Sequence, residues 1–193
     1  MPYIDQKIQT VYTHINNFFI SYNFFTSYLS LLLFQLFHNF MVFFSRYRVI
    51  NDRQDKEPYM ERYYLFIRDR TGFFKYFPFN IMLHRFLKSD PDDLHDHPWP
   101  YCSIILRGGY WEHTLADQTA EITTTVRKWW GPGSIRFSPS TRLHRIELSN
   151  DAIDGTQQVW TLFIPGIKIR DWGFITPSGW INNEDYLNAK KHC

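Results

Sequence analysis

Residues 90–109 read DPDDLHDHPWPYCSIILRGG, and this stretch decides how the rest of the chain is interpreted. Acidic turn residues precede two histidines, and an apolar run that ends in two glycines follows them. His95 and His97 are two residues apart, so on an extended strand their side chains point to the same face. Two imidazoles on one face are able to share a metal ion. The spacing predicts a candidate metal site, and two surface loop histidines are the alternative.

A second stretch, residues 131–147, reads GPGSIRFSPSTRLHRIE and brings His144 to the start of an apolar run, after a proline turn. Around both stretches, short runs rich in aromatic and branched residues alternate with turn residues. We expect strands at residues 63–68, 73–77, 80–87, 103–106, 110–115, 121–129, 134–137, 142–148 and 158–164. Many short strands without helical patterns between them predict an all-β sandwich or small barrel.

The two stretches resemble the two signature motifs of the cupin superfamily. The first motif has two histidines one residue apart, then a glutamate, then a glycine; His95, His97 and Gly109 match it when position 102 takes the place of the glutamate. The second motif is matched in order by Gly133, Pro139 and His144. The resemblance covers residues 63–172. It implies a single antiparallel, jelly-roll-like β-barrel with a metal near its open end.

Cys102 departs from the motif, because a thiol stands where the glutamate is usual. His95, His97 and His144 then form a set of three imidazoles without a carboxylate, and imidazole suits iron, zinc, copper and nickel. The arrangement is similar to that of mammalian-type cysteine dioxygenases, which are cupins with a three-His Fe(II) centre. In those enzymes this cysteine can crosslink to a tyrosine, but residues 159–161 read VWT here. A small buried residue is the alternative role for Cys102.

A closer resemblance is to an uncharacterised family of cupin-like proteins of bacteria, phages and large viruses. Its features are the runs ERYYLF at residues 61–66, HRIEL at 144–148 and WTLFIPGIKIRDWGF at 160–174. This resemblance supports the fold and the metal site and implies no particular reaction.

Two pairs of neighbouring residues offer further site candidates, and in each pair only one side chain is able to face the barrel interior. His84 and Arg85 form the first pair; an inward Arg85 would clamp a carboxylate or phosphate. Glu112 and His113 form the second; an inward Glu112 would act as a base or replace the missing carboxylate ligand. In both cases a solvent-facing side chain is the alternative.

Three residues are candidates for substrate binding: Trp99, Arg136 and Trp160. Large aromatic side chains near a barrel mouth can stack on a substrate, and they can equally fill the core or form a dimer interface. Arg136 would hold an anionic substrate, or would pair with an aspartate of residues 92–96 at the surface.

The N-terminal segment has a different composition. Residues 8–45 contain no Asp, Glu, Lys or Arg, and residues 26–44 approach the length that spans a bilayer as a helix. Arg46 and Arg48 follow, which would place the C-terminal side in the cytoplasm. We expect membrane attachment through residues 18–44; a packed or interfacial helix and a non-native extension are the alternatives.

These observations divide the chain into an apolar, helical segment (1–50), a linker (51–58), the barrel (59–182) and a C-terminal helix and tail (183–193). A homodimer is possible through a barrel edge. The chain has 21 Lys and Arg against 19 Asp and Glu, so no nucleic-acid surface is expected. Two cysteines make no disulfide scaffold and indicate a reducing compartment.

The sequence leaves three functions open. The first is a mononuclear non-haem Fe(II) oxygenase or dioxygenase that acts on a small molecule. The second is a non-redox, metal-dependent sugar isomerase, epimerase or lyase that uses zinc, manganese or nickel. The third is a non-catalytic binding or structural barrel that the N-terminus tethers. Cys102 in place of the glutamate favours iron and oxygen chemistry.

Overall fold

The computed structural model describes residues 27–52, 55–90, 93–116, 125–149 and 158–190 of the chain. It separates into two units, residues 1–45 and residues 46–193. In the first unit, described residues 27–43 are helical, as the composition predicts. No helix in the described part of the chain is long and apolar enough to cross a membrane. Part of the predicted attachment segment, residues 18–26, lies outside the described residues.

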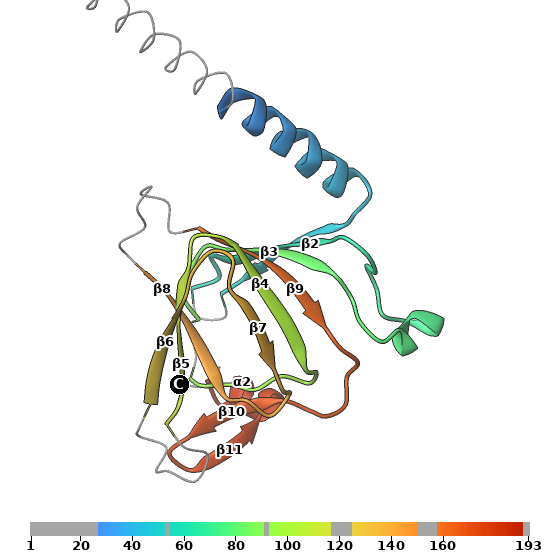
Figure 1. The fold of residues 1–193 in the computed structure, drawn as a ribbon. Coiled ribbons are helices and arrows are strands. Elements are labelled where there is room, and N and C mark those ends of the chain that lie inside the picture. The colour runs from blue at the N-terminus through green and yellow to red at the C-terminus, as the bar shows by residue number, and fades with distance from the viewer. Residues whose placement is uncertain (1–26, 53–54, 91–92, 117–124, 150–157, 191–193) are drawn as a thin grey trace, which may run out of the picture. The chain divides into compact units, whose positions relative to one another are not determined.

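The second unit is built from antiparallel strands, which Figure 1 shows as two sheets wrapped around a common interior. The larger sheet contains, in spatial order, β1 (Tyr47–Asn51), β2 (Pro58–Tyr64), β3 (Met82–Phe86), β9 (Val159–Pro165), β4 (Tyr101–Arg107) and β7 (Ile135–Ser138). The smaller sheet contains β6 (Thr125–Trp130), β5 (Tyr110–Leu115) and β8 (His144–Leu148). The predicted all-β, antiparallel barrel is confirmed.

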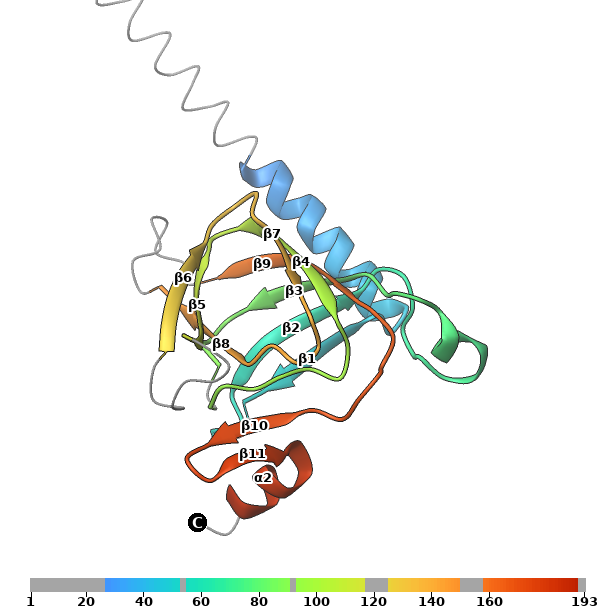
Figure 2. The ribbon, with the colours of Figure 1, turned by 60° about the horizontal axis from the view of Figure 1, so that its bottom comes forward.

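Two further strands and a helix complete the barrel unit at its C-terminal end. The strands β10 (Gly173–Thr176) and β11 (Gly179–Asn182) form a hairpin, and helix α2 (Asn183–Lys190) follows directly. Figure 2 shows the hairpin and the helix together at one end of the barrel. The Asn182 side chain accepts a hydrogen bond from the backbone N–H of Glu184 at 3.0 Å and so caps the start of this helix.

The core lies between the two sheets and follows the alternation of each strand. In β3, Met82, His84 and Phe86 are buried, whereas the two residues between them are half-buried on the other face. Apolar side chains from both sheets meet inside, and they are Met60, Phe86, Ile105, Tyr110, Ile146, Leu148 and Val159. Burial of these side chains removes apolar surface from water and stabilises the barrel.

Several elements differ from the prediction. Strand β2 ends at Tyr64, whereas a strand was predicted at residues 63–68. Strand β1 pairs with β2 although its residues were assigned to the apolar segment and the start of the linker. Residues 73–77, predicted as a strand, lie mostly in a short 3-10 helix, η1 (Gly72–Tyr76). Gly72 has a φ of +53°, which starts a tight turn that β-prone aromatic residues alone do not reveal. The hairpin β10–β11 was not predicted, because its strands are only four residues long.

Candidate metal centre

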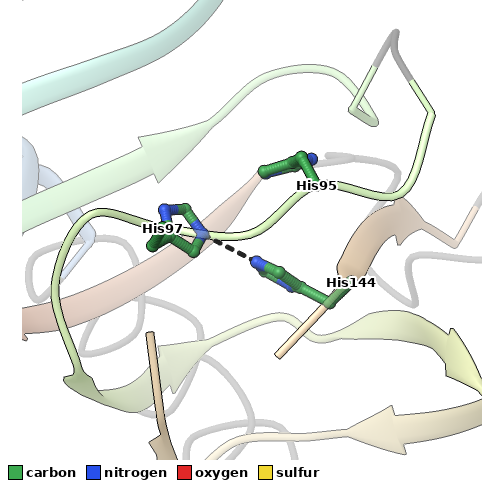
Figure 3. A group of neighbouring side chains, drawn as sticks. All are labelled: His95, His97 and His144. Carbon is green, nitrogen blue, oxygen red and sulfur yellow. Dashed lines mark hydrogen bonds between the residues drawn. The ribbon is translucent and has the colours of Figure 1, made fainter. Parts of the chain in front are cut away.

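Three histidines from two separate segments meet at one end of the barrel (Figure 3). His95 and His97 lie in the segment between β3 and β4, and His144 is the first residue of β8. Backbone pairing aligns the segments: the N–H of His95 donates to the carbonyl of His144 at 3.0 Å, and the reverse bond measures 2.9 Å. This pairing brings together the histidines that the sequence singled out.

The imidazoles are close enough to serve one ion. One ring nitrogen from each histidine lies within 4.8 Å of the other two, and Nε2 of His97 is 2.8 Å from Nε2 of His144. Nitrogen ligands that sit about 2.1 Å from a metal are separated by distances of this order. Among the described residues, no Cys, Asp or Glu belongs to this cluster.

Asp96 holds the segment that carries the first two histidines. Its side chain is 2% exposed and accepts hydrogen bonds from the backbone N–H of Gly173 (2.7 Å), from Trp180 Nε1 (3.1 Å) and from Arg170. The carboxylate therefore ties the segment to the β10–β11 hairpin and leaves His95 and His97 directed inward. The alternative that Arg136 pairs with an aspartate of residues 92–96 at the surface is wrong, because Arg136 is buried and pairs with Glu112.

A buried ion pair supports His144 from behind. Nδ1 of His144 lies 3.3 Å from Oε1 of Glu112 and 3.3 Å from Arg136, and Glu112 and Arg136 bond directly to each other. Trp130 Nε1 donates to the other Glu112 oxygen at 2.8 Å. Metal-ligating histidines commonly use their second nitrogen in this way, with a carboxylate that fixes the ring. Glu112 therefore faces inward but lies behind a ligand candidate rather than among the three.

Burial keeps two of the three histidines, His97 and His144, in the neutral form. The pKa of His144 is held well below its usual value by burial first, and then by the charge of Arg136. Burial followed by the neighbouring His95 lowers the pKa of His97 in the same direction. A neutral imidazole is the form that binds a metal, so the electrostatics suit metal binding across the neutral pH range.

Tyr101, rather than Cys102, faces the cluster. The Tyr101 hydroxyl lies 3.3 Å from His144 Nε2 and accepts a hydrogen bond from Arg136 at 2.6 Å. Cys102 is on the opposite face of β4, where burial raises the pKa of its thiol. The placement of Cys102 in the glutamate position is therefore wrong by one residue. The β4–β5 turn agrees, since Gly108, and not Gly109, has the positive φ, of +71°.

The other candidates divide between the two faces of the larger sheet. Arg136 and Trp99 line the cavity beside the histidines. Arg85 points to the outer face, where it pairs with Glu61 at 2.9 Å and lies over the Trp160 ring. Neither Arg85 nor Trp160 lines the cavity, because their inward-facing neighbours occupy that side of β3 and β9. The expectations of an inward Arg85 and of a substrate contact at Trp160 are not met by this geometry.

The histidines open onto a cavity of about 300 Å³. This volume lies at the lower end of the range for small-molecule sites. Its walls combine aromatic side chains with polar groups that the sequence did not single out, among them Arg62, Ser103 and Thr161. The arrangement suits a small molecule held next to an ion.

The double-sheet antiparallel barrel agrees with the jelly-roll architecture that the sequence resemblance implies. No family model matches the sequence. No curated protein matches it either.

Solved structures with a similar fold have low sequence identity to this chain. A cupin 2 conserved barrel domain protein from Rhodopseudomonas palustris is 12% identical over 69% of this chain and 79% of its own, with a TM-score of 0.48. The polyketide cyclase RemF from Streptomyces resistomycificus is 14% identical over 61% and 71%, with a TM-score of 0.43. A cupin-like protein from Thermotoga maritima is 13% identical over 67% and 84%, with a TM-score of 0.42.

Proposed function

We propose that this chain is a metal-dependent enzyme that holds a mononuclear Fe(II) ion with His95, His97 and His144 and oxidises a small molecule with O₂. The observation that carries the proposal is the convergence of three imidazoles, with that of His144 buried, at the wall of a cavity. A structural zinc site is closed by four protein ligands, whereas three leave positions for substrate and a second small molecule. The bound ion would supply the redox chemistry.

The residues around the histidines orient and desolvate the reactants. Glu112 fixes the His144 ring through Nδ1, and Arg136 connects Glu112 to the Tyr101 hydroxyl. Tyr101 accepts from Arg136, and its hydroxyl lies 3.3 Å from His144 Nε2, so its own O–H is placed to donate at the histidine cluster. The aromatic walls, including Trp99, exclude water from the site.

A second candidate function is a non-redox isomerase, epimerase or lyase that uses zinc, manganese or nickel. The position of Tyr101 favours it, because a buried phenol between an arginine and the histidine cluster is suited to move a proton. Cys102 no longer separates the two candidates, since its thiol lies on the outer face.

Metal content tests the first proposal. The full-length chain, purified without chelator from iron-supplemented medium, should contain about one iron by elemental mass spectrometry. His144→Ala should bind Fe(II) more than about 100-fold more weakly, because loss of a ligand exceeds the loss caused by its supporting residues. His113→Ala is the matched control, because His113 pairs with Glu147 outside the cavity.

Nitric oxide probes the open positions of the iron. The Fe(II)-loaded wild type should give the high-spin EPR signal of an iron–nitrosyl, and His144→Ala should not. Binding of zinc, manganese or nickel in preference to iron would favour the second candidate. A chain that takes up no metal would overturn both.

A further inference from the structure

Three polar side chains form a row across the larger sheet, on the face that lines the cavity. Arg62 of β2 is opposite His84 of β3, and His84 is opposite Thr161 of β9. All three line the cavity onto which His95, His97 and His144 open. We call Arg62, His84 and Thr161 the polar row. The metal-ligand candidates and the polar row therefore face the same enclosed space.

The hydrogen bond between Arg62 and His84 has a defined direction. Nε–H of Arg62 donates to Nε2 of His84 at 3.0 Å. Because Nε2 accepts this hydrogen bond, it carries no proton, and the imidazole is neutral. Burial, and then the charge of Arg62, hold the pKa of His84 well below its usual value. His84 stacks on Phe163 with ring centroids 4.8 Å apart. The imidazole thus orients the guanidinium and adds no negative charge to balance it.

No acidic residue of the described chain forms an ion pair with Arg62. Its polar neighbours besides His84 are the Tyr64 and Tyr59 hydroxyls and a second cation, Arg48. In contrast, three other arginines of the barrel are each paired with a carboxylate, namely Arg85 with Glu61, Arg136 with Glu112 and Arg170 with Asp96. A guanidinium has five N–H donors, and a cation turned toward a cavity without a counter-ion favours an anion there.

Other polar atoms that line the cavity also support the binding of a polar ligand there. Thr161 Oγ1 and Trp99 Nε1 are buried and have no hydrogen-bond partner among the described residues. Of the two aspartates that line the cavity, Asp90 accepts from the backbone N–H of Ile146 at 2.6 Å and from the Tyr59 hydroxyl. Glu112 does not line the cavity and is already balanced by Arg136, to which it bonds directly.

We propose that Arg62 is the binding site for the carboxylate of a small monoanionic substrate, with His84 as the residue that positions the guanidinium. The fork of Arg62 matches a planar carboxylate, and the volume of about 300 Å³ admits a small organic acid whose other end faces the three histidines. This inference rests on the proposed function, because it names the substrate class of the same site.

Calorimetric titration of the metal-free, full-length chain in EDTA tests the carboxylate site. The probes are benzoate, its neutral counterpart benzamide and inorganic phosphate. Benzoate should bind the wild type at least about 10-fold more tightly than benzamide, and Arg62→Gln should weaken benzoate binding by about 10- to 100-fold. Arg85→Gln, with the same charge change on the outer face of the neighbouring strand, should bind benzoate as the wild type does.

Arg62→Lys keeps the positive charge and removes the planar pair of N–H donors. Its affinity for benzoate should therefore fall between those of the wild type and Arg62→Gln. If Arg62→Gln does not fold, Arg62→Lys provides the test. Equal binding of benzoate and benzamide, unchanged benzoate binding in the Arg62 variants, or tighter binding of phosphate than of benzoate would overturn the proposal.

Cobalt(II) titration separates this inference from the metal site. Arg62→Gln should bind cobalt with the wild-type stoichiometry, whereas metal-free His144→Ala should keep benzoate binding. Loss of benzoate selectivity with intact cobalt binding would overturn the carboxylate site alone. Absence of cobalt binding with intact benzoate selectivity would overturn the metal site alone.

Discussion

The two faces of the larger sheet use similar residues in opposite ways. On the outer face, Arg85 of β3 meets Glu61 of β2 and Gln158, so its charge is balanced where water also reaches it. On the inner face of the same two strands, Arg62 donates to the neutral His84 and, among the described residues, forms no ion pair with a carboxylate. The contrast teaches that residue type does not assign a role in this barrel. The face of the sheet on which a residue lies assigns its role. A charge without a counter-ion is costly in the barrel interior unless a ligand balances it.

The same contrast divides the glutamates of the smaller sheet. Glu112 on β5 is 2% exposed and pairs with Arg136, which is equally buried. Glu147 on β8 is partly exposed and pairs with Arg145 at 3.2 Å and with His113 at 2.8 Å. Surface pairs contribute little to stability, whereas a buried charge left alone is strongly destabilising.

Substitution of the inner glutamate should have the largest effect. Glu112→Gln leaves the Arg136 guanidinium buried without a carboxylate, and we expect the free energy of unfolding to fall by about 3–5 kcal/mol. The affinity for cobalt should also drop by about 10- to 100-fold, because the support of His144 Nδ1 is lost. Urea denaturation and cobalt titration measure the two effects.

Glu147→Gln is the control for Glu112→Gln, since it makes the same change on the outer face. It should lower stability by less than about 1 kcal/mol and leave cobalt binding unchanged. Equal losses in the two variants would contradict the contrast between the faces.

Acidification should have the second largest effect, through the buried histidines of the barrel interior. His84, His97 and His144 have pKa values well below the usual value, with burial as the largest cause in each case. Below about pH 6.5 the unfolded chain therefore binds more protons than the native chain. The free energy of unfolding of the metal-free protein should be highest above that pH and should decrease as the pH falls. Each histidine contributes up to about 1.4 kcal/mol per pH unit.

Thermal unfolding of the metal-free chain between pH 7.5 and pH 5.5 measures this dependence (~4 kcal/mol per pH unit in total at most). His144→Gln removes one of the three groups and should reduce the slope by about a third. A stability that does not change over this range would show that the three histidines are already protonated or solvated in the native state.

Much of the fold and of the three-His cluster follows from local sequence patterns. The spacing of His95 and His97 places them on one face, and turn residues with short β-prone runs predict the barrel. The polar row was not predicted, because β2 reads PYMERYY and its alternation is hidden by polar and aromatic residues on both faces. The Glu112–Arg136 pair joins different strands, so no spacing in the sequence reveals it.

The position of Tyr101 was missed for a different reason. Side chains alternate strictly along a strand, so a count that is wrong by one residue moves a side chain to the opposite face. The cupin motif has three or four residues between the second histidine and the glutamate, and the longer spacing selects Cys102 and Gly109. The structure has Tyr101 inward and the positive φ at Gly108, which fits the shorter count.

Adjacent substitutions on β4 test that register and should give the smallest effects. Tyr101→Phe removes the acceptor that Arg136 contacts at 2.6 Å, so the free energy of unfolding should fall by about 1.5–3 kcal/mol. Cys102→Ser, one residue away on the outer face, should change it by less than about 1 kcal/mol. Neither variant loses a ligand candidate, so both should bind cobalt with the wild-type stoichiometry. If Cys102→Ser instead lowered cobalt binding while Tyr101→Phe did not, the thiol would have to reach the histidines. Strand β4 would then be shifted by one residue from the pairing of Tyr101 with Ser138 of β7 and Pro165 of β9.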